Sequence, residues 1–147
     1  MNKCVRHLYL VLLVFVFSSC QQMASHESKF PWKPFSKQAL VDAVAQHKPV
    51  VIDFWADWCP ICHELDRTLF SVPGIQAKLS QVIALRMDAT NQDDPAVQAI
   101  LQQYQVDGLP TIVFIDTKGQ EIPNARVIGF VTPHDFEQSL AMFNIFK

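Results

Sequence analysis

Hydrophobic residues along this chain fall into short blocks of two kinds. Runs dominated by apolar residues at 49–55, 82–87 and 111–116 are typical of buried strands. The blocks between them repeat their apolar residues every three or four positions, which is the period of an amphipathic helix. Strands that alternate with helices in this way predict an α/β fold.

Capping and turn residues mark where these elements begin and end. Ser36 is placed to cap a helix at 36–47. Further helices are expected at 59–70, 73–79 and 95–104 and from Thr132 onward. A turn at 117–120 predicts that a strand at 126–129 runs antiparallel to the strand before it. Two of these helices should each bury one apolar stripe. In the helix at 59–70 the stripe is Ile61, Leu65 and Leu69, and in the last helix it is Phe136, Leu140 and Phe143.

The N-terminus carries a different pattern. Lys3 and Arg6 precede an apolar stretch from Leu8 to Phe17, and small residues follow. A basic start, a short apolar centre and a small-residue end are typical of a secretion signal. The stretch is much shorter than the roughly 20 residues that span a bilayer, so a retained transmembrane anchor is only the alternative.

Cys20 follows this signal directly, after two serines. The arrangement resembles a bacterial lipoprotein signal, in which the cysteine becomes the lipidated first residue; an ordinary cleaved signal is the alternative. We expect a signal peptide at 1–19, a lipid-anchored tether with an extended segment at 20–35, and a single domain at 36–147. We expect the chain on the periplasmic side of the outer membrane, because Gln21 is not the aspartate that commonly retains lipoproteins at the inner membrane.

Charge and cysteine content narrow the possible functions. Without the signal, ten basic residues stand against 14 acidic ones, a net charge near −4, so nucleic-acid binding is not expected. The signal accounts for Cys4 and the lipid for Cys20, which leaves Cys59 and Cys62 as a pair. We expect a monomer with no cofactor and no bound metal.

Cys59 and Cys62 lie where the strand at 49–55 gives way to a helix. Pro60 suits the first helical position, which needs no N–H, so the helix should begin at Cys59. Residues three apart on a helix lie about 5–6 Å apart at Cβ, which suits a disulfide that can open and close. The positive end of the helix stabilises a thiolate. Cys59 is therefore the predicted nucleophile and Cys62 the resolving thiol.

Three motifs in this order resemble the thioredoxin-like family over about residues 36–146: DFWADWCPIC at 53–62, GLPTIVFID at 108–116, and Gly129 before the last helix. They are most similar to the C-terminal thioredoxin-like domain of the thiol:disulfide interchange protein DsbD. The resemblance implies a thioredoxin fold, with a central mixed sheet flanked by helices, and thiol–disulfide oxidoreductase activity.

The resemblance also implies roles for further residues. Pro110 corresponds to a cis-proline beside the disulfide, and Leu109 would bind the partner through its main chain. Asp53 lies in an apolar strand, where burial should raise its pKa and fit it to accept the proton of Cys62. Asp66, one helical turn after Cys62, would share that proton. A purely structural role for Asp53 and a solvated position for Asp66 are the alternatives.

Substrate and electron donor are inferred from the same likeness. Trp58 is expected to shield the disulfide and contact the substrate, whereas Trp55 is expected in the core. Protein disulfides would be the substrates, and a DsbD-like membrane protein the electron donor. The likeness to DsbD implies a reductive direction. Pro60 and Ile61 replace the Gly-Pro of ordinary thioredoxin, and the residues between the cysteines affect the redox potential, so a disulfide oxidase or isomerase is the alternative.

Two other functions would use the same cysteines differently. The segment from Cys59 to His63 fits C-x-x-C-H, the attachment pattern of c-type haem, although a haem site also needs surrounding helices and a second ligand. A copper-delivery module would bind Cu(I) through Cys59 and Cys62, with or without His63. Structural zinc is not expected, because such sites normally use four ligands.

Overall fold

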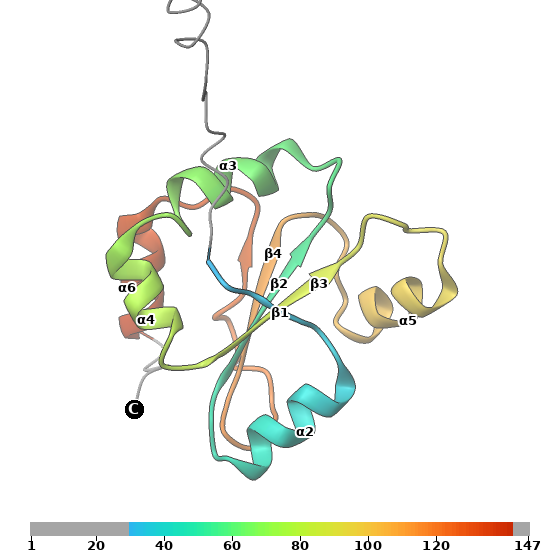
Figure 1. The fold of residues 1–147 in the computed structure, drawn as a ribbon, viewed down its shortest axis with the longest axis horizontal. Helices are drawn as coiled ribbons and strands as arrows, with labels where there is room; N and C mark the ends of the chain where they lie inside the picture. Colours follow the sequence, from blue (N-terminus) through green and yellow to red (C-terminus); the bar gives the residue numbers. More distant parts are fainter. Residues whose placement is uncertain (1–29, 143–147) are drawn as a thin grey trace, which may run out of the picture.

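The computed structural model describes residues 30–142, and within them a five-stranded sheet forms the centre (Figure 1). Its strands, in spatial order, are β1 (Lys33–Pro34), β3 (Ile83–Asp88), β2 (Val50–Trp55), β4 (Thr111–Ile115) and β5 (Val127–Ile128). Strands β1, β3 and β2 are parallel, whereas β4 is antiparallel to both β2 and β5. The mixed sheet expected from the sequence is confirmed.

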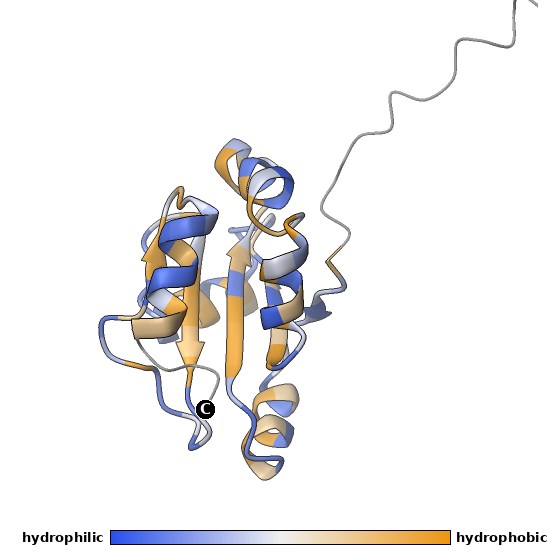
Figure 2. Cartoon of the chain, turned by 90° about the vertical axis from the view of Figure 1, so that its left-hand side faces the viewer, coloured by the Kyte–Doolittle hydropathy of each residue, from blue (hydrophilic) through white to orange (hydrophobic). Residues whose placement is uncertain are grey.

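Five helices in the described part of the chain cover the two faces of this sheet. They are α2 (Lys37–Ala45), α3 (Pro60–Thr68), α4 (Pro73–Leu79), α5 (Pro95–Gln103) and α6 (Pro133–Met142). Apolar residues of α3, α4 and α6 pack on one face, and those of α2 and α5 pack on the other. Figure 1 shows α4 and α6 together, with α5 across the sheet from them. In Figure 2 the central strands are mostly hydrophobic, while the helices mix both kinds of residue.

Alternation along β2 decides which side chains meet which helices. Val51 belongs to the core under α3, α4 and α6, whereas Ile52 and Phe54 belong to the core under α2 and α5. Successive side chains of a strand point to opposite faces. Asp53 therefore lies on the same face as Val51, toward α3.

The predicted helix boundaries agree with the structure to within three residues. Ser36 is the N-cap of α2, and its hydroxyl accepts a hydrogen bond from the Ala39 N–H at 3.1 Å. Asp94 caps α5 in the same way, through the N–H of Ala96. The predicted signal peptide, Cys20 and Phe143 lie outside the described residues.

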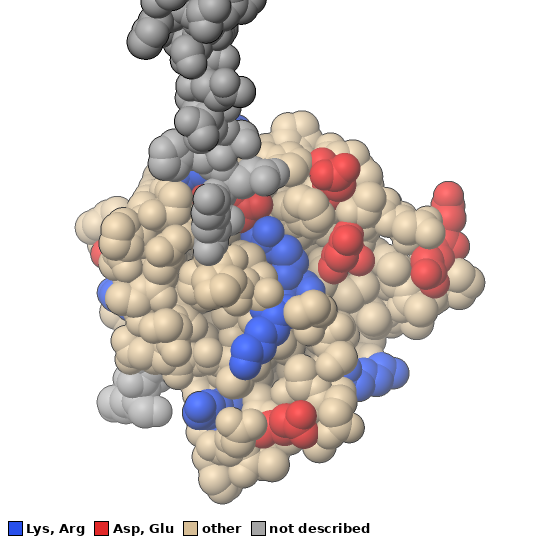
Figure 3. Space-filling view, in the orientation of Figure 1, with Lys and Arg blue, Asp and Glu red and all other residues tan. Residues whose placement is uncertain are grey.

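The extended segment at 30–35 packs on the domain and also adds to its sheet. Phe30 is buried, and Lys33–Pro34 forms β1 along the outer edge of β3. The backbone N–H of Phe35 donates to the carbonyl of Arg86 at 2.9 Å. The segment is thus held by main-chain hydrogen bonds directly beside Arg86. Figure 3 shows a stripe of Lys and Arg side chains on the face of the molecule that carries β1. No helix within residues 30–142 has the length and apolar character needed to cross a membrane.

Candidate active site

Cys59 and Cys62 form a disulfide at the start of α3, with their Cα atoms 5.3 Å apart. Cys59 is the N-cap of the helix and Pro60 its first residue, as the sequence predicted. The Sγ atom of Cys59 accepts a hydrogen bond from the Cys62 N–H at 3.1 Å. The helix N-terminus therefore offers Cys59 both a donor and a positive dipole end, and these stabilise a thiolate when the disulfide is open.

Both cysteines are buried, and they pack with Ala56 against Trp55 and Leu109. Leu109 precedes Pro110 through a cis peptide bond, as the family likeness implied. The carbonyl of Pro110 accepts a hydrogen bond from the N–H of Gly129 at 2.9 Å, directly after β5. The segment carrying Leu109 is thus fixed against the disulfide.

Large apolar side chains are exposed around this site. Trp58 is 54% exposed, and its indole Nε1 donates to the carbonyl of Thr90 at 2.9 Å. Phe130, next to Gly129, is 52% exposed. Exposed apolar groups beside a reactive centre are typical of a surface that binds another molecule.

The position of Ile61 differs from the sequence prediction, which placed it with Leu65 and Leu69 on the buried stripe. Ile61 is 44% exposed. The buried residues of α3 are Cys62, Leu65 and Asp66, so Cys62 takes the inward position in the first turn and Ile61 lies on the outer side. Ile61 therefore belongs to the exposed surface near the disulfide.

Asp53 and Asp66 lie on the same side of the sheet and share one cation, Arg86. The guanidinium Nε donates to Asp53 Oδ2 at 2.9 Å, and Nη2 lies 2.8 Å from the same oxygen. Two further bonds, of 2.6 and 3.2 Å, reach the two oxygens of Asp66. Both carboxylates are buried. Asp53 thus bonds an arginine rather than a backbone group, and Asp66 is not solvated.

Burial raises the pKa of Asp53 to about 6, and the negative charge of Asp66 adds to this effect. The positive charge and hydrogen bond of Arg86 oppose the rise but do not cancel it. The direction is the one that the sequence predicted from a carboxylate in an apolar strand. Asp53 is therefore poised to exchange a proton close to neutral pH.

Arg86 was not identified from the sequence. Its guanidinium lies 4.9 Å from the ring centre of Trp32 and 5.3 Å from that of Trp55. Strand β3 places Arg86 opposite Asp53 in register. The available signal was a single charged residue within an otherwise apolar strand, which indicates a buried partner for the charge.

His63 is half-buried, and its side chain contacts residues that precede α3. Its Nε2 lies 2.6 Å from the carbonyl oxygen of Asp57, and its ring meets that of Trp55 edge-on at 5.5 Å. Within residues 30–142, no three His, Cys, Asp or Glu side chains are grouped so that they could hold a metal ion.

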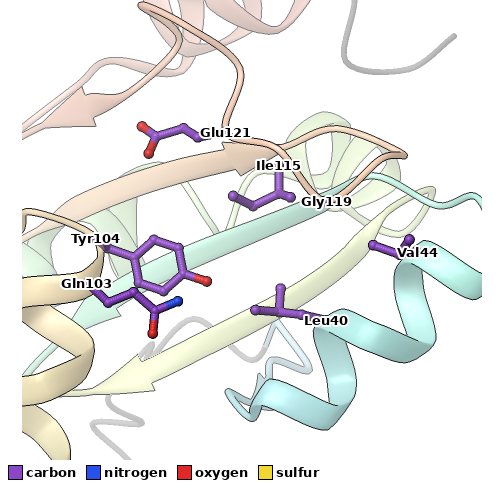
Figure 4. Close-up of a pocket in the computed structure, with 7 residues that line it drawn as sticks. All are labelled: Leu40, Val44, Gln103, Tyr104, Ile115, Gly119 and Glu121. Atoms are coloured by element: carbon purple, nitrogen blue, oxygen red, sulfur yellow. The ribbon is translucent and has the colours of Figure 1, made fainter.

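A pocket of about 250 Å³ lies at the other end of the sheet, between α2, the end of α5 and the turn after β4 (Figure 4). Ile115 lines it, and Ile115 pairs with Val50 at the start of β2, whereas Cys59 follows the end of β2. The pocket contains no cysteine and lies apart from the disulfide.

A cysteine pair at a helix N-terminus, over a mixed sheet of this strand order, defines a thioredoxin-fold thiol–disulfide oxidoreductase. The chain belongs to the thioredoxin-like domain family, whose profile matches residues 36–144.

Two curated relatives are thiol:disulfide interchange proteins DsbD. The protein of Pectobacterium atrosepticum is 39% identical over 132 residues, which cover 88% of this chain and 22% of that protein. The protein of Escherichia coli K12 is 44% identical over 103 residues, covering 70% of this chain and 18% of that protein. The chain thus spans about a fifth of the length of these relatives.

Solved structures agree with this assignment. The oxidised C-terminal domain of Neisseria meningitidis DsbD matches with a TM-score of 0.64 at 29% identity, covering 72% of this chain and 90% of that chain. A thioredoxin from Thermus thermophilus matches with a TM-score of 0.64 at 26% identity, covering 78% of this chain and 86% of that chain.

Proposed function

We propose that this chain reduces disulfides of periplasmic proteins through Cys59 and Cys62. The observation that carries the proposal is the cysteine pair at the start of α3, where Cys59 Sγ already accepts the Cys62 N–H. A thiolate on Cys59 is the nucleophile in such exchange. The similarity to DsbD supports the reductive direction.

The exchange has two steps. The thiolate of Cys59 attacks one sulfur of the substrate disulfide, and the other substrate sulfur leaves as a thiolate. Cys62 then loses its proton and attacks the Cys59 sulfur, which releases the second substrate thiolate. The substrate gains two electrons, and the Cys59–Cys62 pair loses them and closes as the disulfide seen here.

Asp53 is the proposed acceptor of the Cys62 proton, and Asp66 shares the charge through Arg86. A carboxyl group with a pKa of about 6 is mostly ionised at neutral pH and can take up a proton from a thiol. Asp66 follows Cys62 by one helical turn and binds the same guanidinium as Asp53. The two carboxylates and Arg86 therefore form one charged cluster beside the resolving cysteine.

The substrate would bind over the exposed apolar groups at this end of the domain. Trp58, Ile61 and Phe130 offer apolar area, and Leu109 would pair with the substrate through its main chain. Trp58 and Ile61 flank Cys59 in the sequence, and Leu109 packs on the cysteines. Phe130 follows Gly129, whose N–H donates to the Pro110 carbonyl. A protein substrate would bury them, whereas a small disulfide would contact only part of them.

The location and electron donor complete the proposal. Lipid on Cys20 would attach the chain to the outer membrane on its periplasmic side, and a DsbD-like membrane protein would reduce Cys59–Cys62 after each turnover. Membrane fractionation of the wild type and of Cys20→Ala tests the anchor: the wild type should sediment with outer membranes and the variant should be soluble. A soluble wild type would remove the anchor from the proposal.

The redox potential of the Cys59–Cys62 couple tests the direction. Equilibration with glutathione should give a value near that of thioredoxin, about −270 mV. A value near the roughly −120 mV of DsbA, with the protein found as a disulfide in cells, would make it an oxidase instead.

A further inference from the structure

The guanidinium of Arg86 is enclosed on several sides at once. Aromatic rings of Trp32 and Trp55 lie 4.9 and 5.3 Å from its Cζ atom. Its N–H groups are directed to the carboxylates of Asp53 and Asp66. A planar guanidinium can stack on aromatic faces and bind carboxylates with its edge at the same time.

Trp32 is one of the residues around the Arg86 guanidinium, and it lies outside the helices and strands of the domain. It lies in the N-terminal extended segment, one residue before β1. Its ring meets those of Phe30 and Phe70 edge-on, each at 4.9 Å. Pro34 pairs in register with Arg86, so main-chain pairing and ring contacts together fix Trp32 over the guanidinium.

We propose that Trp32 is a positioning residue for the redox reaction: it covers the outer side of the Arg86 guanidinium and thereby keeps water from the Asp53 carboxylate. The N-terminal segment is then a functional part of the active site. This inference rests on the proposed function, because its importance for catalysis depends on Asp53 as proton acceptor.

Few charged groups face Asp53. A change in its pKa on substitution of Trp32 can therefore be assigned to the lost cover. Arg86 faces it from β3 and Asp66 from α3, while its partner on β4 is the apolar Ile112. Lys33 of β1 pairs with Leu85 and so points to the opposite face of the sheet. The thiol of Cys62 titrates only when reduced, so the oxidised protein is the one to use.

The experiment follows the carboxyl carbon of Asp53 by ¹³C NMR during a pH titration of the oxidised full-length protein. In Trp32→Ala, water should reach the cluster. Because burial is the largest influence on this group, the pKa should fall from about 6 toward the ordinary value of about 3.9. Trp32→Leu, which keeps apolar cover and is the milder change for folding, should give a smaller fall in the same direction.

Phe35→Ala is the matched control. Phe35 belongs to the same N-terminal segment, but its ring packs on Tyr104 on the other face of the sheet. Its loss should leave the titration of Asp53 unchanged. The inference is overturned if both Trp32 variants titrate like the wild type, or if Phe35→Ala shifts Asp53 as far as Trp32→Ala does. The titration needs no turnover, so a failure of the proposed reductase activity would be seen separately, in the wild-type assay.

Discussion

Asp53 and Arg86 face each other across β2 and β3, and their side chains form a salt bridge in which Nη2 lies 2.8 Å from Oδ2. The second oxygen, Oδ1, is buried and has no hydrogen-bond partner among the described residues. One side of the carboxylate is therefore held by a cation while the other can accept a proton. A buried acceptor without a partner is costly, and such costs are often retained at functional sites.

The first prediction concerns stability and pH. The pKa of Asp53 is about 6 in the folded protein and about 3.9 in an unfolded chain. The folded state therefore binds more protons between these pH values, so the stabilising contribution of Asp53 is present below about pH 4 and is lost as the pH rises through 6. Relative to wild type, Asp53→Asn should gain about 2 kcal/mol of unfolding free energy between pH 4 and pH 7.5.

Urea unfolding of the oxidised proteins at several pH values measures this difference. Asp42→Asn, which removes an exposed carboxylate from α2, controls for the loss of one surface charge. If the stability curves of Asp53→Asn and the wild type run parallel across this range, Asp53 does not have the raised pKa.

The second prediction concerns the rate at which Cys62 resolves the mixed disulfide. This rate should fall as the pH drops below about 6, because protonated Asp53 cannot accept the Cys62 proton. Asp53→Asn should lower the rate at pH 7 by on the order of 100-fold, the usual contribution of a general base. Stopped-flow release of a fluorescent thiol from a preformed Cys59 mixed disulfide measures it. An unchanged rate in Asp53→Asn would assign the proton to another acceptor.

The third prediction concerns Arg86. Arg86→Gln leaves two buried carboxylates without their shared cation, which should destabilise the protein by about 3–5 kcal/mol at neutral pH. Arg67→Gln removes a solvent-exposed pair with Glu64 and should cost no more than about 1 kcal/mol. Thermal unfolding of both variants gives the comparison. Equal losses would mean that the Arg86 cluster contributes no more than a surface ion pair.

The fourth prediction concerns the exposed apolar surface at the disulfide. Ile61→Asp and Phe130→Asp should slow reduction of a protein disulfide about 10-fold or more, because a buried charge without a partner opposes docking. Reduction of a small aromatic disulfide should change little in Phe130→Asp, which lies outside the cysteine motif. Val41→Asp replaces an exposed apolar residue on α2 and should not affect either substrate. Equal slowing of both substrates by Phe130→Asp would indicate damage to the thiol chemistry rather than to docking.

Local chemistry explains why the position of the cysteines could be predicted from the sequence. Pro60 fits only the first turn of a helix, and the apolar run before it had the length and composition of a buried strand, so Cys59 had to lie at their junction. Asp53 was recognisable for a similar reason, as a carboxylate inside that run. Each of these inferences needs only neighbours in the chain.

The charged cluster could not be assembled in the same way. Arg86 lies 33 residues from Asp53 along the chain, and only the register of β2 on β3 brings them together. The sequence indicated an extended segment before residue 36, but the contact of Trp32 with Arg86 depends on β1, a two-residue strand too short to leave a periodic pattern. The exposure of Ile61 likewise depends on which side of α3 faces the sheet, and that side carries Cys62, Leu65 and Asp66.

The central claim is that Cys59 and Cys62 reduce disulfides by way of a mixed disulfide on Cys59. Insulin reduction with dithiothreitol as electron source tests it most directly, with the wild type, Cys59→Ser and Cys62→Ser compared in one assay. In this assay the wild type should turn over and Cys59→Ser should be inactive. When reduced Cys62→Ser is incubated with insulin before dithiothreitol is added, it should form a disulfide-linked adduct, which dithiothreitol then releases. Turnover that survives in Cys59→Ser would contradict the claim.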